Sequence, residues 1–281
     1  MCDPCRAPAP IGKPVISAGV WSQPGNGDIG AARGRQDRQH RRPELAWARV
    51  PHHLGIGSTF VCNLYSMTSA PEAVLRLFRV SHNRASGLEP RDAFFPGHTA
   101  PIVRRAADGA REAVAASWGF VLPQPGKAPR RVTNFRDDKT RTSPFWRESF
   151  EQRRCLVPAT AFCEPREVKP ATWHWFALRA AEPRPLFAFA GIWRRWRGPI
   201  RKEGDPVDIE TFAFMTTLPN ALVATINHER MPVILEGDDA IETWLEGSPD
   251  AAFALAQPTA PERMAIVQGG FEKRDLLAPL P

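Results

Sequence analysis

Short apolar segments of strand length recur along most of this chain, and they restrict its fold more than any other feature of the sequence. They cover residues 113–122, 155–162, 173–178, 186–193, 211–217 and 231–235. Helical patterns are fewer and cover residues 71–78, 145–152, 240–246 and 250–256. Regular alternation of the two patterns, which would indicate a parallel α/β sheet, is therefore missing. We predict an α+β fold with a largely antiparallel sheet or open β-barrel core and peripheral helices.

Residues 1–61 differ in character from the rest of the chain. Proline, glycine and arginine interrupt them, as in the run RGRQDRQHRRP, and no helical or strand period is sustained. We expect a disordered or mis-annotated N-terminal extension, with a propeptide as the alternative, followed by one domain over residues 62–281. Eight Lys and Arg minus four Asp and Glu place +4 of the net charge of +7 in the extension, which leaves +3 for residues 62–281. This balance permits a polyanionic partner and does not establish one.

Composition and motifs argue against several classes of protein. No apolar stretch is long enough to span a bilayer and no secretory signal precedes the domain, so we expect a cytoplasmic protein with no membrane partner. Five scattered cysteines suggest no disulfide framework, and the Cys2–Cys5 pair has no second ligand pair, so we assign no metal. The sequence contains no phosphate-binding glycine loop, and we assign no cofactor.

Four segments of the domain each contain a residue that is suited to catalysis. The segments are VCNLYSM with Cys62, TNFRDD with Asn134, CLVPATAFCEP with Glu164 and TINHERMPVIL with His228. Together they supply a thiol, an amide, a carboxylate and an imidazole. Each residue taken singly also has a structural explanation, such as a small core cysteine or a turn-forming asparagine.

The order and flanking residues of these segments resemble the SOS-response-associated peptidase (SRAP) family, whose members shield abasic sites in DNA. The resemblance extends to PGHTAPIV around Pro96, WGF at residues 118–120 and RRCLVPA at residues 153–159. It implies that Cys62, Asn134, Glu164 and His228 form the active site. The chain departs from the family pattern at Cys163, where an aromatic residue is common, and at Leu64, near which an arginine is common. The usual acidic residue after the N-x-R motif is Asp138.

An N-terminal cysteine suits the chemistry that this resemblance implies. A ring-opened abasic sugar presents an aldehyde, and the α-amine of an N-terminal cysteine condenses with it to an imine. The neighbouring thiol then closes a five-membered thiazolidine, which an internal cysteine cannot do because its nitrogen belongs to an amide. We expect Glu164 and His228 to transfer protons and Asn134 to orient the amine.

Other residues of the matched motifs are candidates for binding single-stranded DNA that contains an abasic site. We expect Arg136 and Arg230 to contact phosphates, because guanidinium groups match phosphate oxygens in pairs. Trp118 and Pro96, with Phe95, are candidates for stacking on bases beside the lesion. Solvation of the arginines and a core position for Trp118 are the structural alternatives.

Two other functions remain open at the level of sequence. One is a cysteine peptidase in which Cys62 is the nucleophile, His228 the base and Glu164 its orienting group, with hydrolase or lyase activity residing in the same site. The other is a nucleic-acid-binding module without catalysis. Whichever function holds, including the first, we expect a monomer.

The position of Cys62 raises the question of where translation begins. Val61 stands where the family has its initiator methionine, and the codon GUG is read as valine internally and as methionine at a bacterial start. Initiation there followed by methionine removal would leave Cys62 first in a chain of 281 − 61 = 220 residues. Self-cleavage before Cys62 is the alternative.

Overall fold

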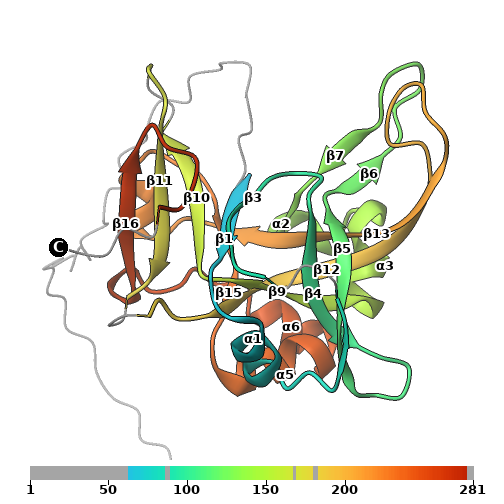
Figure 1. The fold of residues 1–281 in the computed structure, drawn as a ribbon, viewed down its shortest axis with the longest axis horizontal. Helices are drawn as coiled ribbons and strands as arrows, with labels where there is room; N and C mark the ends of the chain where they lie inside the picture. Colours follow the sequence, from blue (N-terminus) through green and yellow to red (C-terminus); the bar gives the residue numbers. More distant parts are fainter. Residues whose placement is uncertain (1–62, 86–88, 167–168, 180–182, 277–281) are drawn as a thin grey trace, which may run out of the picture. The chain divides into compact units, whose positions relative to one another are not determined.

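Two sheets contain most of the strands in the computed structural model, which describes residues 63–85, 89–166, 169–179 and 183–276 (Figure 1). The first sheet has the order β16 (Met264–Gly270), β11 (Thr172–Leu178), β10 (Ala161–Arg166), β1 (Leu64–Met67) and β3 (Arg91–Phe94). The second has the order β14 (Met231–Pro232), β13 (Val207–Thr217), β12 (Phe187–Gly198), β9 (Arg154–Ala159), β4 (Thr99–Arg105), β5 (Arg111–Trp118) and β2 (His82–Arg84). Two short strands join the second sheet, β15 (Ile234–Leu235) on β12 and β8 (Asn134–Arg136) on β13. A separate hairpin pairs β6 (Phe120–Leu122) with β7 (Arg130–Val132).

The helices are short and lie at the periphery of these sheets. They are α1 (Pro71–Leu77), α2 (Asp137–Thr140), α3 (Pro144–Gln152), α4 (Ala221–Ala224), α5 (Gly237–Glu246), α6 (Pro249–Ala254) and a 3₁₀ turn at Pro261–Arg263. Helix α5 packs against β9, and α3 packs against β9 and β12. Most strand pairs are antiparallel, with parallel pairing of β2 with β5, β5 with β13 and β8 with β13. The predicted α+β class with a largely antiparallel sheet is confirmed, whereas the extension expected at residues 1–61 lies outside the described residues.

Three of the predicted strands are divided in the structure, and the segment 231–235 is one of them, because β14 pairs with β13 and β15 with β12. The segment 113–122 becomes β5 and β6, because Gly119 between them has a φ of +105°, a conformation that side-chain-bearing residues rarely adopt. The segment 155–162 becomes β9 and β10, which belong to different sheets and are separated at Thr160. Strand β4 was not predicted from the sequence. It contains Pro101, which lacks the N–H of a regular ladder and weakens the strand signal.

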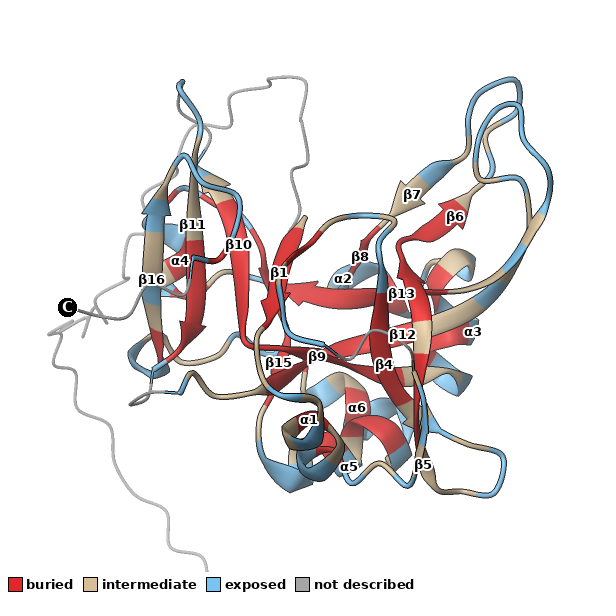
Figure 2. Cartoon of the chain, in the orientation of Figure 1, coloured by how far each residue is buried: buried red, intermediate tan, exposed pale blue. Residues whose placement is uncertain are grey.

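Aromatic side chains from both sheets fill one common core. Tyr65 and Phe162 from the five-stranded sheet meet Phe189 from the other, with ring centroids 5.7 Å and 6.3 Å from that of Phe189. Phe162 also stacks on Phe176 of β11 at 5.2 Å. The opposite face of the five-stranded sheet has a smaller cluster that includes Cys163 and Trp175. Buried residues follow the central strands in Figure 2. Alternate residues of β10 thus face two different apolar environments.

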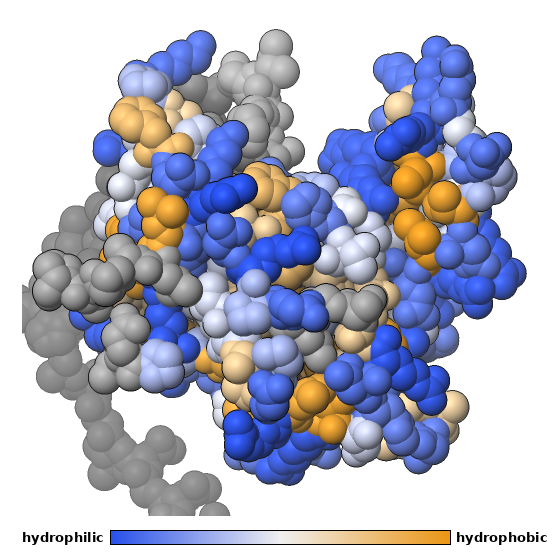
Figure 3. Space-filling view, in the orientation of Figure 1, coloured by the Kyte–Doolittle hydropathy of each residue, from blue (hydrophilic) through white to orange (hydrophobic). Residues whose placement is uncertain are grey.

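On the face drawn in Figure 3, hydrophilic side chains predominate and hydrophobic ones gather in a few separate patches. Within the described residues, no helix is long and apolar enough to cross a membrane.

Candidate active site

Strand β10 carries Glu164 into the interior of the protein. Its side chain faces the same side of the sheet as Phe162, two residues earlier, and the residue has no exposed surface. A buried carboxylate is costly unless polar or charged groups stabilise it. Glu164 is therefore a specific feature of the fold and not a solvated charge at a strand end.

One charged or polar partner of this carboxylate is His228. It follows α4 in a tight segment where Asn227 has a φ of +58°, and its Nε2 atom lies 2.8 Å from Oε2 of Glu164. This is the distance of an ion pair, without the alignment of a hydrogen bond. His228 is 8% exposed, and its burial lowers its pKa. The charge of Glu229 opposes this shift without cancelling it. The imidazole is thus kept neutral near pH 7, with one nitrogen able to accept a proton.

Asn134 begins β8 and lies at the end of a short chain of polar contacts. Parallel pairing with Phe214 fixes its backbone beside β13, and its side chain is 8% exposed. The Asn134 amide donates a hydrogen bond of 3.0 Å to Oγ1 of Thr133, which in turn donates one of 3.4 Å to Oδ1 of Asn63. Asn63 directly follows Cys62 in the sequence, so this chain of contacts leads from the predicted orienting amide to the neighbour of the predicted nucleophile.

Cys62 itself lies outside the described residues. The two cysteines that the structure describes, Cys155 and Cys163, are both buried. Burial raises the pKa of each thiol well above its usual range, and the charge of Glu164 adds to the effect at Cys163. Neither is a candidate nucleophile, because the reactive form of cysteine is the thiolate.

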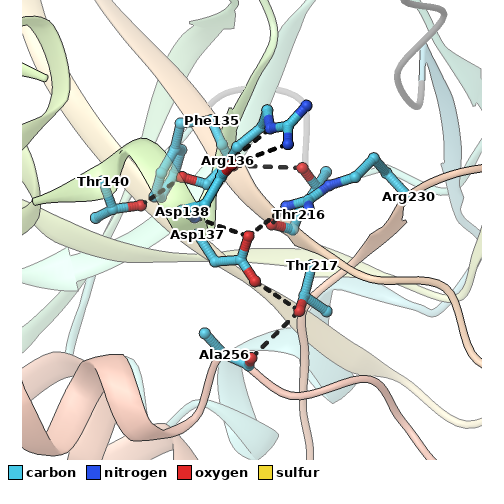
Figure 4. A network of polar contacts seen from close by, with 9 residues as sticks. All are labelled: Phe135, Arg136, Asp137, Asp138, Thr140, Thr216, Thr217, Arg230 and Ala256. Atoms are coloured by element: carbon cyan, nitrogen blue, oxygen red, sulfur yellow. Dashed lines mark hydrogen bonds and ion pairs between the residues drawn. The ribbon is translucent and has the colours of Figure 1, made fainter. Parts of the chain in front are cut away.

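The two arginines expected to bind phosphate have different environments, which Figure 4 compares. Arg136 is half exposed at the start of α2 and forms two hydrogen bonds of 2.9 Å with Asp138. Arg230 is 8% exposed, and its guanidinium binds Asp137 at 2.5 Å and the backbone oxygen of Thr216. Arg230 therefore anchors α2 to β13, and its guanidinium is not available at the surface for a phosphate.

The structure corrects the expectation that Trp118 stacks on DNA bases. Its side chain has no exposed surface and stacks on Phe214 at 5.4 Å, and its indole N–H donates a hydrogen bond of 3.1 Å to the backbone oxygen of Thr133. The structural alternative, a core position, is the one observed. Its W-G-F context reflects a buried strand followed by the Gly119 turn.

A cavity of about 550 Å³ opens beside Asn63. Its walls are mostly apolar, and Pro96, which is exposed, lies among them with Phe95 and Trp173. Three exposed cations also line it, Arg166, Lys169 and Lys273. None of the three forms an ion pair with any residue that the structure describes, although Nζ of Lys273 lies 4.4 Å from the ring centroid of Trp173.

Sequence reasoning did not identify these cations or Trp173, because they follow no spacing motif. Arg166 ends β10, Lys169 precedes β11, which carries Trp173, and Lys273 follows β16. The missing signal was the strand register, which pairs Pro165 with Trp173. In the described part of the chain, no group of three His, Cys, Asp or Glu side chains is placed to hold a metal ion.

Known proteins resemble this chain in both sequence and fold. The sequence profile of the SOS response associated peptidase (SRAP) family matches residues 61–268. The abasic site processing protein YoqW of Bacillus subtilis is 33% identical over 156 residues, which are 54% of this chain and 66% of YoqW, slightly under two thirds of that protein. YoaM of Bacillus subtilis, also named an abasic site processing protein, is 27% identical over 74% of this chain and 90% of YoaM.

Solved structures share the fold at lower sequence identity. A protein from Bacteroides thetaiotaomicron superposes with a TM-score of 0.58 at 24% identity, over 73% of this chain and 90% of that one. A protein from Bordetella bronchiseptica gives a TM-score of 0.56 at 21% identity, over 74% and 98% of the two chains.

Proposed function

The chain belongs to the SOS response associated peptidase family, and from this membership we propose that it recognises abasic sites in single-stranded DNA and bonds to them covalently through Cys62. The relatives named abasic site processing proteins support the substrate. The observation that carries the proposal is the buried pair of Glu164 and His228, with Nε2 and Oε2 2.8 Å apart. Such a pair suits proton transfer in a site closed to bulk water.

The proposed reaction joins the abasic aldehyde to the first residue of the working protein. The neutral α-amine of Cys62 attacks C1′ of the opened sugar, and the adduct loses water to become an imine. The thiol then adds to the imine carbon, its proton passes to nitrogen, and a thiazolidine forms. The sum is aldehyde plus aminothiol giving thiazolidine and one water, so no oxidant or cofactor enters.

Glu164 and His228 take the proton-transfer steps of this reaction. The ionised carboxylate accepts a proton from the attacking amine, and a protonated group must then deliver one to the leaving hydroxyl. Two adjacent groups can exchange that proton without solvent. Asn134 orients the amine through the contacts that run by Thr133 to Asn63.

The cavity beside Asn63 lies against the face of β10 opposite to Glu164, so in this proposal it holds a nucleotide that flanks the abasic site and not the abasic site itself. Its apolar wall with Phe95, Pro96 and Trp173 suits an unstacked base, and its three cations without ion pairs suit the adjoining phosphates. Arg136 supplies a further phosphate contact once its guanidinium has released Asp138. Arg230 supports the site from the interior instead of touching DNA.

A direct test is to incubate the protein with abasic single-stranded DNA and look for a heat-stable adduct on a denaturing gel. We expect an adduct with the wild-type protein and none with Cys62→Ala or Cys62→Ser, while both variants keep noncovalent binding. An adduct of normal yield with either variant would refute the mechanism.

The chemistry requires a free amine on Cys62, so residues 1–61 must be absent or removed in the working protein. Initiation at Val61 is the route that we propose. Intact-mass measurement of protein expressed from the native gene region, with upstream DNA included, should give a species that begins at Cys62. A stable species that begins at Met1 and still crosslinks DNA through Cys62 would contradict it.

A cysteine peptidase is the second candidate, favoured by the same contact of His228 with Glu164, since a carboxylate commonly orients the imidazole of a thiol–imidazole pair. Its natural substrate would be the peptide bond that precedes Cys62. Turnover of unrelated peptides together with failure to crosslink abasic DNA would favour this function over the first.

A further inference from the structure

His174 on β11 is a partly buried imidazole that the proposed reaction does not use. It pairs with Glu164 in the antiparallel register of β10 and β11, and Phe162 pairs with Phe176 two residues away. The rings of that second pair stack at 5.2 Å, which shows that these positions of both strands face the same side. Glu164 and His174 therefore project side by side, with Cβ atoms about 5 Å apart, as directly opposed residues are.

Both ring nitrogens of His174 are shielded from solvent, and neither has a hydrogen-bond partner among the residues that the structure describes. An imidazole has at least one donor, and leaving its polar atoms unsatisfied in the interior costs free energy. The ring therefore needs a partner close by.

The neighbourhood of the ring limits which groups can serve. On β16, Gly269 pairs with His174, and a Cβ added to it would lie 3.8 Å from Nδ1 of His174. Because glycine has no side chain, this neighbour offers no ionisable group. On β10 the charged residues of the same face are Glu164 and Arg166. Burial and then the charge of Arg166 lower the pKa of His174, so the ring is neutral near pH 7 and can donate one N–H.

We propose that His174 is a positioning residue for Glu164, donating a hydrogen bond to its carboxylate, directly after a turn of the side chain or through one bound water. The carboxylate is then held between two imidazoles, His174 from β11 and His228 from the segment after α4. The contact between His174 and Glu164 is argued from the structure, and its effect on adduct formation rests on the proposed function.

The proposal predicts the pKa of Glu164. A donor to the ionised carboxylate favours that form, so removing it raises the pKa. We expect the Glu164 carboxyl signal, followed by carbon-13 NMR and assigned by its loss in Glu164→Gln, to titrate about one pH unit higher in His174→Leu. His174→Asn or His174→Gln carries an amide N–H near Nδ1 or Nε2 respectively, and we expect one of them to restore the wild-type midpoint. His82→Leu, on β2 of the other sheet, is the matched control and should leave the midpoint unchanged.

The same variants give a second measurement with abasic single-stranded DNA. We expect His174→Leu to slow adduct formation about tenfold without changing noncovalent affinity. A Glu164 midpoint that is the same in wild type and His174→Leu would overturn the proposal. Were His174→Leu not to fold, a midpoint raised in both the Asn and Gln variants would overturn it as well. The titration needs no DNA, so failure of the wild-type protein to crosslink would refute the proposed function and leave this inference to the titration.

Discussion

Glu164 and His228 show how strongly single positions can depend on their surroundings. The carboxylate has no exposed surface, and the imidazole that meets it comes from a segment 64 positions later in the chain. Their contact offsets part of the free-energy cost of burying both groups.

The first prediction concerns the carboxylate. Glu164→Gln keeps the shape of the side chain and removes its ability to exchange a proton, so adduct formation at neutral pH should slow by about 10²-fold or more. Single-turnover kinetics on denaturing gels measure this rate, with denaturant unfolding as the control for folding. A rate equal to that of the wild type would remove Glu164 from the reaction.

The second prediction concerns pH and stability. The pKa of His228 is lower in the folded state than in the unfolded chain, because burial disfavours the charged ring. The folded state therefore binds fewer protons, and its free energy of unfolding falls as the pH drops below the unfolded value of about 6.5. Urea titrations from about pH 7.5 to 5.5 should show a shallower fall for His228→Gln than for wild type. His82→Gln, at a partly exposed histidine paired with Asp108, should follow the wild type. Parallel curves for wild type and His228→Gln would contradict the prediction.

At the level of elements, local pattern predicted the middle of strands and helices and gave no prediction of which strands pair. Helix α3 and strand β11 match their predicted ranges to within one residue. Strand β4 escaped prediction because Pro101 interrupts its pattern, yet the strand is held between β5 and β9. Pairing to neighbours on both sides outweighs the loss of one ladder hydrogen bond.

Helix α2 supplies the third prediction, because its first two residues bind two arginines in opposite environments. Removing Arg230 leaves the partly buried Asp137 without this ion-pair partner, so Arg230→Met should lower the free energy of unfolding by about 3 kcal/mol. Arg136→Met breaks an exposed pair and should cost less than about 1 kcal/mol. DNA affinity should respond in the reverse order, with Arg136→Met losing about one unit of the salt slope. Equal stability losses in the two variants would contradict the structural assignment.

At the scale of the whole molecule, the proposed binding of DNA has little net charge to draw on. Residues 62–281 have a net charge of only +3, which is +7 for the chain minus +4 for residues 1–61. In the proposed function, attraction to DNA must therefore come from the positions of particular cations. Arg166, Lys169 and Lys273 gather at one cavity and have no ion pair within the described residues. In the proposed function, the positive charge gathered at this cavity takes the place of a strongly positive potential over the whole protein.

The fourth prediction follows from that arrangement. About four phosphate contacts, from the three cations of the cavity and Arg136, give a slope of log affinity against log salt of about 3 in magnitude for a single strand. Titrations of fluorescent single-stranded DNA at several salt concentrations measure it, and an intact duplex of the same sequence should bind more weakly because its bases cannot enter the cavity. Lys169→Gln should reduce the slope and Lys127→Gln, on the loop between β6 and β7, should not. Equal affinity for duplex, or an affinity independent of salt, would count against the cavity as the DNA site.

The sequence by itself determined the family, through motifs whose residues are close together in the chain, and the class of fold, through local periodicity. It named Glu164 and His228 without showing that they touch. Tertiary structure alone decided that Trp118 is a core residue, that Arg230 binds Asp137, and that His174 stands opposite Glu164. The physical reason is that local pattern reflects which face of an element is apolar, whereas such contacts depend on the register between strands and on segments that meet only after the chain has folded.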